Sequence, residues 1–164
     1  RAPSRSIEFS YECDIDTLAK LEAAADWIGA VVDRELRSGG RDSTTQVVLA
    51  GFAHGGLVAL YAALTKLADK LTGVVTINAP CIYPKFLSKK IKSHLRDTDI
   101  VCLAGANDKV FDVAKQRSVV EADLDNMLPN LRFQQLAYGE HEVSSLEIEA
   151  LQTTFATFLD TPSL

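Results

Sequence analysis

The sequence has few of the features that mark secreted, membrane-spanning or nucleic-acid-binding proteins. Its three cysteines, Cys13, Cys81 and Cys102, are far apart and odd in number, so we expect neither a disulfide framework nor a zinc site. No apolar run approaches the roughly 18 residues that a membrane helix needs, and no long apolar stretch follows the basic start, as a signal peptide would require. The formal net charge of −5 disfavours nucleic-acid binding, because an acidic surface repels phosphate groups. Free thiols are typical of a reducing compartment, which predicts an intracellular protein of the cytoplasm or an organelle matrix.

The remaining composition is that of a folded domain. Hydrophobic residues make up 47% and charged residues 24% of the 164 positions, which excludes an intrinsically disordered chain. There is no internal repeat, low-complexity tract or linker, so residues 1–164 are interpreted as one domain. The first residue is Arg1 rather than Met, and we therefore expect the natural start to be absent from this chain.

Hydrophobic patterning predicts an α/β domain. Apolar residues at steps of three and four predict a helix that begins near Asp14 or Asp16 and ends at Gly39-Gly40. Short apolar runs predict four strands, and further helices are expected between and after them: strands Val47–Ala50, Val74–Ile77, Asp99–Leu103 and Leu131–Leu136, and helices Leu57–Leu71, Val113–Met127 and Ser144–Leu159. Because strands alternate with helices, we expect a mainly parallel sheet with helices on both faces. The strand Val47–Ala50 would form an exposed apolar edge, which a partner chain could cover.

The most informative segment is Gly51-Phe52-Ala53-His54-Gly55-Gly56, between a predicted strand and a predicted helix. It has the layout of a nucleophile elbow, G-x-S-x-G, with Ala53 in the serine position. A tight turn from strand to helix pushes the central side chain out at the carboxyl end of the sheet, and the glycines leave room for the chain to approach itself closely. The N–H groups at the start of the helix point at the same place, which favours developing negative charge.

Two downstream residues are candidates to assist a nucleophile at position 53. Asp108 follows the third predicted strand and His141 the fourth, both at the carboxyl ends where open parallel sheets bind ligands. A post-strand aspartate is also a common turn former, and Asp112 and, less so, Asn107 are alternatives for the acid. The order nucleophile, acid, histidine along the chain is that of a hydrolase triad.

These motifs resemble the α/β-hydrolase fold, and more narrowly the carboxylesterase and phospholipase branch that includes the acyl-protein thioesterases. The similarity lies in the elbow GFAHGG, the preceding helix that ends Asp33-Arg34-Glu35-Leu36, and the segments GANDKV and YGEHE. It implies that position 53 is the nucleophile position, Asp108 the acid and His141 the base. It also implies an oxyanion-binding N–H at His54, no metal or other cofactor, and an acyl ester or thioester substrate. The substrate pocket is expected to include Phe52, Cys81 and Val110.

The sequence departs from this family pattern in two ways. Ala53 has a methyl group where the nucleophilic oxygen belongs, so acyl transfer through a covalent intermediate is not possible there. The fold also takes a second oxyanion N–H from a loop after an earlier strand, and no strand precedes the first predicted helix. The resemblance therefore implies that the N-terminal strands of the fold lie upstream of Arg1, and that this chain is the C-terminal part of it.

Two explanations of Ala53 remain open at this point. The protein is an esterase or thioesterase whose serine has been deliberately replaced, which the intact glycines, Asp108 and His141 favour. Alternatively, it is a natural pseudoenzyme retained as a structural or partner-binding subunit, which the uncovered strand Val47–Ala50 favours. Both explanations predict that the chain with Ala53 is catalytically inactive.

Overall fold

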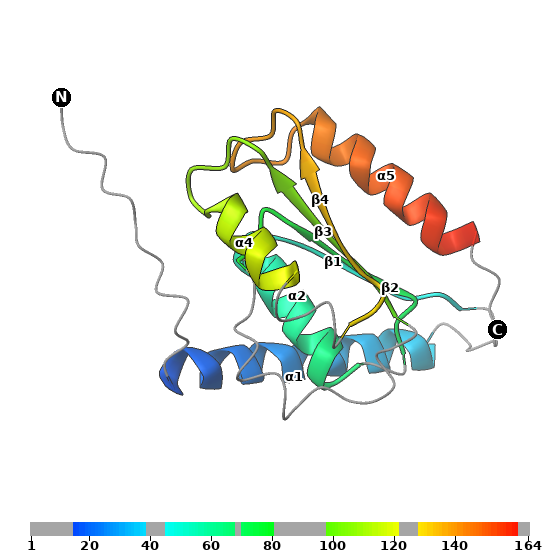
Figure 1. Ribbon diagram of the computed structural model, residues 1–164. Coiled ribbons are helices and arrows are strands. Elements are labelled where there is room, and N and C mark those ends of the chain that lie inside the picture. The colour runs from blue at the N-terminus through cyan, green and yellow to red at the C-terminus, as the bar shows by residue number, and fades with distance from the viewer. Residues whose placement is uncertain (1–14, 39–44, 68–69, 81–97, 122–127, 161–164) are drawn as a thin grey trace.

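The computed structural model describes residues 15–38, 45–67, 70–80, 98–121 and 128–160 (Figure 1). Its centre is a sheet of four strands, β1 (Val48–Phe52), β2 (Gly73–Ile77), β3 (Asp99–Gly105) and β4 (Leu131–Leu136). The strands lie in the order β1-β2-β3-β4, and each neighbouring pair is parallel. The predicted parallel sheet is therefore confirmed.

Helices cover both faces of this sheet, as the alternating pattern predicts. Among the described helices, α1 (Ile15–Ser38), α2 (His54–Thr65) and α4 (Val113–Val119) lie on one face, and α5 (Ser145–Asp160) lies on the other (Figure 1). The result is an arrangement of three layers, with α1 packed on the outer side of α2.

The two faces of the strands carry two hydrophobic cores. Successive side chains of a strand point to opposite faces, and the buried strands β2 and β3 are apolar on both. Val74, Ile100 and Cys102 face α2, whereas Val75, Val101 and Leu103 face α5 and the fully buried ring of Phe158. This double burial explains why both strands are continuous apolar runs instead of alternating ones.

The helix α1 uses the face that its sequence predicts. The apolar side chains at steps of three and four all belong to the core between α1, α2 and the sheet: Leu18, Leu21, Ala25, Ile28, Val32 and Leu36. Ala25 is completely buried, so the helix is held by its apolar stripe. Of the expected cap residues, Asp14 and Gly39-Gly40 lie outside the described residues, whereas Asp16 lies inside α1, which begins at Ile15, and is therefore not its cap.

The boundaries of α2 differ from the prediction at both ends. The helix begins at His54, directly after the elbow, and ends at Thr65 instead of Leu71. Beyond it, the Lys66 and Leu67 N–H groups both donate to the Ala62 carbonyl, and the chain turns back towards β2. The sequence pattern misses this end because Leu67 and Leu71 remain buried in the turn, so apolar spacing continues where the helix does not.

Smaller differences concern the strands and the other helices. β1 runs one residue later at its start and two later at its end than predicted, and β3 continues to Gly105. β4 has the predicted bounds, and α5 begins one residue later than expected because Ser144 caps it. α4 ends at Val119 instead of the predicted Met127, with Val120 as its cap, and residues 122–127 lie outside the described part.

β1 is one of the two edge strands of the described sheet, as the sequence predicts, and β4 is the other. β1 pairs with β2 over its whole length, and no described strand lies on its other side. Its side chains are half-buried and Ala50 is exposed, whereas every residue of β2 is buried. The apolar strand therefore keeps backbone hydrogen-bonding groups that a further strand could use.

The packing of α5 on the sheet can be tested at Gly73. A methyl group there would lie 2.5 Å from Cε2 of Phe158, so we expect Gly73→Ala to destabilise the fold by about 1–3 kcal/mol through overpacking. Gly29 in α1 is the matched control, because a methyl group there meets nothing within 4 Å. Gly29→Ala is expected to stabilise the protein by about 0.5–1 kcal/mol, the usual gain of alanine in a helix. Urea unfolding followed by circular dichroism measures both, and equal stability of Gly73→Ala and the parent would contradict the described contact.

Candidate active site

Ala53 connects β1 to α2 in a strained backbone conformation. Its φ of 50° and ψ of −125° lie in a region that side-chain-bearing residues rarely adopt and that has an energetic cost of about 1–3 kcal/mol. Its N–H donates to the Ile77 carbonyl at 2.9 Å, and its own carbonyl accepts the N–H groups of Gly56 and Leu57 at 3.0 and 3.2 Å. These bonds hold the residue at the end of the strand and start the helix from it.

Two of the three glycines of the elbow, Gly51 and Gly56, are required by close contacts, whereas a Cβ on Gly55 would meet nothing within 4 Å. A Cβ on Gly51 would lie 2.3 Å from the Gly55 carbonyl oxygen, and a Cβ on Gly56 would lie 2.6 Å from Cβ of Ala79. Both distances are shorter than atoms tolerate, so larger residues would open the turn. The strand-to-helix turn that the spacing predicts is therefore present, with Ala53 at its apex.

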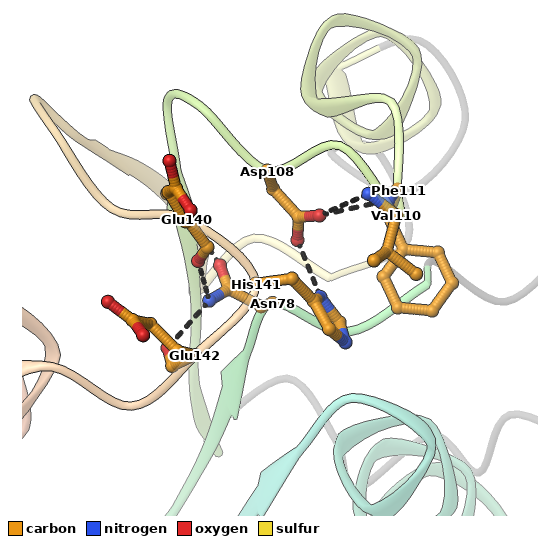
Figure 2. Close-up of polar contacts among 8 residues, drawn as sticks. Asn78, Asp108, Val110, Phe111, Glu140, His141 and Glu142 are labelled. Carbon is orange, nitrogen blue, oxygen red and sulfur yellow. Dashed lines mark hydrogen bonds and ion pairs between the residues drawn. The ribbon is translucent and has the colours of Figure 1, made fainter. Parts of the chain in front are cut away.

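Asp108 and His141 form a hydrogen-bonded pair at the ends of the neighbouring strands. Nδ1 of His141 lies 2.9 Å from Oδ2 of Asp108, as Figure 2 shows. The other carboxylate oxygen accepts the backbone N–H groups of Val110 at 2.7 Å and Phe111 at 3.0 Å. The Asp108 side chain is only 1% exposed. Because a carboxylate only accepts hydrogen bonds, Nδ1 carries the ring proton and Nε2 is left as the basic nitrogen.

Aromatic rings connect this pair to the elbow. The ring centroid of His141 lies 5.0 Å from that of Phe52, the residue before Ala53, and 5.1 Å from that of Phe111. The ring of Phe111 also packs edge-on against that of His54, the residue after Ala53, with a distance of 6.1 Å between the ring centroids. The His141 side chain is still 21% exposed. The His141 ring is thus held beside the elbow, between two aromatic rings, and stays partly exposed to solvent.

The structure distinguishes among the three candidates for the acid. The Asp112 side chain accepts the Lys115 N–H at 3.0 Å and caps the start of α4. Asn107 is exposed, and its backbone N–H donates to the Gly139 carbonyl. Asp108 is the residue of these three that pairs with His141.

The three residues expected in the substrate pocket differ in where the structure places them. Phe52 contacts His141, while the Val110 side chain is 42% exposed and its backbone N–H binds Asp108. Cys81 lies outside the described residues. Cys102 offers no substitute nucleophile, because burial raises the pKa of its thiol while a hydrogen bond with Thr76 opposes this less strongly. The reactive form of cysteine is the thiolate.

Sequence reasoning missed two buried polar residues near the site. Asn78 follows β2 with a φ of 45° and is completely buried, and its amide binds the segment that carries His141. Glu147 in α5 is also buried, and its Oε2 accepts both the N–H and the hydroxyl of Ser144. The spacing S-x-x-E before an apolar run is the signature of a capping box and could have identified Glu147. For Asn78 the available signal is an asparagine directly after a strand, which is compatible with a left-handed turn.

The described part of the chain offers no evident metal site. No group of three or more His, Cys, Asp or Glu side chains among these residues is arranged to hold an ion. None of the described helices has the length and apolarity needed to cross a membrane.

Comparison with known proteins identifies the family to which this fold and site correspond. A sequence model of the phospholipase/carboxylesterase family matches residues 10–159. The chain belongs to this family of α/β-hydrolases. A search of curated proteins finds no significant match.

Solved structures of this α/β-hydrolase's relatives share its fold at low sequence identity. SOBER1 of Arabidopsis thaliana has a TM-score of 0.76 at 15% identity, over 91% of this chain and 68% of SOBER1. Acyl-protein thioesterase 2 of Zea mays has a TM-score of 0.69 at 17% identity, over 85% of this chain and 66% of that enzyme. The Bacillus cereus carboxylesterase has a TM-score of 0.65 at 15% identity, over 84% of this chain and 61% of the carboxylesterase chain. The chain of this family member thus spans about two thirds of the length of these relatives.

The strain at the elbow of this α/β-hydrolase can be measured directly. Glycine adopts the Ala53 conformation without steric penalty, so we expect Ala53→Gly to raise the free energy of unfolding by about 1 kcal/mol. Ala156, exposed in α5, is the matched control, because Ala156→Gly should lower the stability by about 1 kcal/mol. Urea unfolding of both variants provides the measurement. A loss of stability in Ala53→Gly as large as in Ala156→Gly would show that the elbow is unstrained.

Proposed function

We propose that the fold carries an acyl-transfer site of the serine-hydrolase type for carboxylic esters or thioesters, with position 53 as the nucleophile position. The observation that carries this proposal is the Asp108–His141 pair held by aromatic contacts beside a strained elbow. Strained backbone conformations are concentrated at functional sites. A turn that served only to connect β1 to α2 would have no use for the strain or for the pair beside it.

The proposed chemistry requires a serine in place of Ala53. His141 Nε2 would take the proton of the serine hydroxyl while the oxygen bonds to the acyl carbon, and Asp108 would hold the ring and stabilise its cation. The same nitrogen would then give the proton to the leaving alcohol or thiol. Water, activated in the same way, would release the acid and restore the serine.

The developing oxyanion would be stabilised by backbone N–H groups. The His54 N–H, at the first residue of α2, is the proposed donor from this chain. In this fold the second donor comes from a loop after an earlier strand, which we propose to be supplied by the N-terminal part of the fold upstream of Arg1.

With Ala53 in place, we propose that the chain does not hydrolyse esters. A methyl group cannot form the acyl bond, and loss of the nucleophile in serine hydrolases lowers turnover by about 10⁶. Asp108 and His141 would remain paired, because their hydrogen bond does not depend on the side chain at position 53.

The second candidate function is that of a natural pseudoenzyme that binds a partner chain. The observation that favours it is the edge of the sheet at β1, where apolar side chains are half-buried and no described strand pairs on the outer side. An added strand from a partner would complete the backbone hydrogen bonds at this edge. We expect no nucleic acid among the partners, because the net charge is acidic. We also expect an intracellular location, because the sequence predicts free thiols.

The proposed activity is tested by Ala53→Ser. We expect this variant, in a chain extended by the family's N-terminal strands, to react with a fluorophosphonate probe and to hydrolyse short acyl esters, while the Ala53 form does neither. The matched control is Ala53→Ser combined with His141→Gln, which keeps the hydroxyl but removes the base. Absence of both labelling and hydrolysis in the folded Ala53→Ser variant would contradict the hydrolase proposal.

The roles of Asp108 and Asp112 are distinguished by substituting each of them in the Ala53→Ser variant. Asp108→Asn is expected to lower kcat by about 10⁴, the effect of losing the acid partner of a triad histidine. Asp112→Asn is the matched control, because asparagine caps a helix as well as aspartate does and should leave kcat unchanged. Steady-state ester hydrolysis compares the two. Equal losses in both variants would reject Asp108 as the acid.

The pseudoenzyme alternative predicts a stoichiometric partner at β1. Purification of the native assembly followed by cross-linking mass spectrometry should place a second chain beside Val48–Phe52. A monodisperse monomer with strands of its own at this edge would argue against that alternative.

A further inference from the structure

Asn78 is a buried amide at the carboxyl end of β2, between the segments that carry Asp108 and His141. We infer that it is a positioning residue that sets the His141 ring against Asp108. The catalytic meaning of this inference rests on the proposed function, in which His141 is the base. The positioning itself is a property of the described contacts.

The donor half of the amide holds the segment of His141. Nδ2 of Asn78 donates to the Glu140 carbonyl at 2.8 Å and to the Glu142 carbonyl at 3.1 Å, the residues immediately before and after His141 (Figure 2). Both N–H groups of one amide are thus used on the carbonyls of the two residues that flank the histidine. Fixing these carbonyls restrains the backbone from which the ring projects.

The acceptor half of the amide holds the segment of Asp108. Oδ1 of Asn78 accepts the Gly105 N–H at 2.7 Å, and the Gly105 carbonyl in turn accepts the Asp108 N–H at 3.1 Å. One planar side chain therefore spans both partners of the 2.9 Å Nδ1–Oδ2 contact. A change in its position would move the base relative to the acid.

The chemistry of this position is restrictive. An amide offers two donors and an acceptor in one plane, whereas a carboxylate of the same shape would place an oxygen, in the position of Nδ2, against the Glu140 and Glu142 carbonyls. The φ of 45° at Asn78 suits asparagine and glycine better than other residues. Asn78 is completely buried, so water would not readily replace the lost bonds.

Other contacts anchor the neighbouring backbone, and one of them joins the same two loops. The Asn107 N–H binds the Gly139 carbonyl, and the Glu142 N–H binds the Glu140 carbonyl within the segment itself. Neither of these two backbone bonds holds both the Glu140 and the Glu142 carbonyls. Ser144 and Glu147 fix the start of α5. Removing the Asn78 amide should therefore loosen the histidine segment while these anchors keep the fold intact.

Two substitutions separate the parts of the amide. Asn78→Asp keeps the acceptor for Gly105 and deletes both donors, whereas Asn78→Gly keeps the backbone conformation and deletes the whole side chain. With isotope-labelled histidine, the chain with Ala53 gives ring signals from its three histidines, which His→Gln variants assign. We expect hydrogen exchange of the His141 Nδ1–H to become about tenfold faster, or its signal to be lost, in both Asn78 variants.

The matched control is Asn107→Asp, which makes the same chemical change in the exposed residue beside Asp108 and should leave the His141 signal in place. Circular dichroism reports on folding in each case. An unchanged His141 signal in folded Asn78 variants would overturn the inference, since a merely structural residue alters stability without altering the ring. Unfolding of both Asn78 variants would also overturn it, because Asn78 would then support the whole fold.

The activity of Asn78 substitutions in the Ala53→Ser variant distinguishes a failure of this inference from a failure of the proposed function. We expect the Asn78 substitutions to lower the kcat of the Ala53→Ser variant by about 10- to 100-fold through misplacement of the base, with KM little changed. If the Ala53→Ser variant has no activity at all, the hydrolase proposal fails, and the ring signal of His141 alone decides the role of Asn78.

Discussion

Parallel pairing of β1 to β4 brings the carboxyl ends of all the described strands to one edge of the sheet, and the candidate site is built from the loop residues at that edge. Ala53 comes directly after β1, Asn78 directly after β2, Asp108 lies beyond the end of β3, and His141 lies beyond the end of β4. These residues are widely separated in the chain and meet because the ladder of backbone hydrogen bonds fixes the order and register of the strands. An antiparallel sheet of the same segments would send half of these ends to the opposite edge.

Close backbone approaches at this edge determine how near the loops come to one another. A Cβ on Gly105 would lie 2.3 Å from the Gly139 carbonyl oxygen, just as one on Gly51 would meet Gly55. Glycine at these positions lets the loop after β3 contact the loop after β4, and lets the elbow fold back on itself. Two polar side chains that this crowding buries are satisfied by groups of the same edge. Asp108 accepts two backbone N–H groups, and Asn78 uses both ends of its amide.

Much of this organisation follows from short-range patterns. The α1 stripe of apolar residues, the bounds of β4 and the elbow spacing each depend on neighbours within a few positions, and each is predicted correctly from the sequence. The C-terminal end of α2 is different, since Leu67 and Leu71 stay in the core after the helix has ended, so burial and helical periodicity cease to coincide. The choice between Asp108 and Asp112 also lies beyond local patterns, because both are short acidic side chains that accept backbone N–H groups.

The sequence by itself determined the succession of strands and helices, the glycine-bounded turn around Ala53 and the order in which an acid and a histidine follow it. These features are set by side-chain periodicity and by the steric freedom of glycine, which act along the chain. Tertiary structure alone decided that Asp108 is the partner of His141 and that Asn78 connects their segments. The Asp108–His141 hydrogen bond joins residues that are 33 positions apart, and the Asn78–Glu140 bond joins residues that are 62 positions apart. Such bonds depend on the packing of whole strands, and no local sequence pattern indicates which polar groups that packing places in contact.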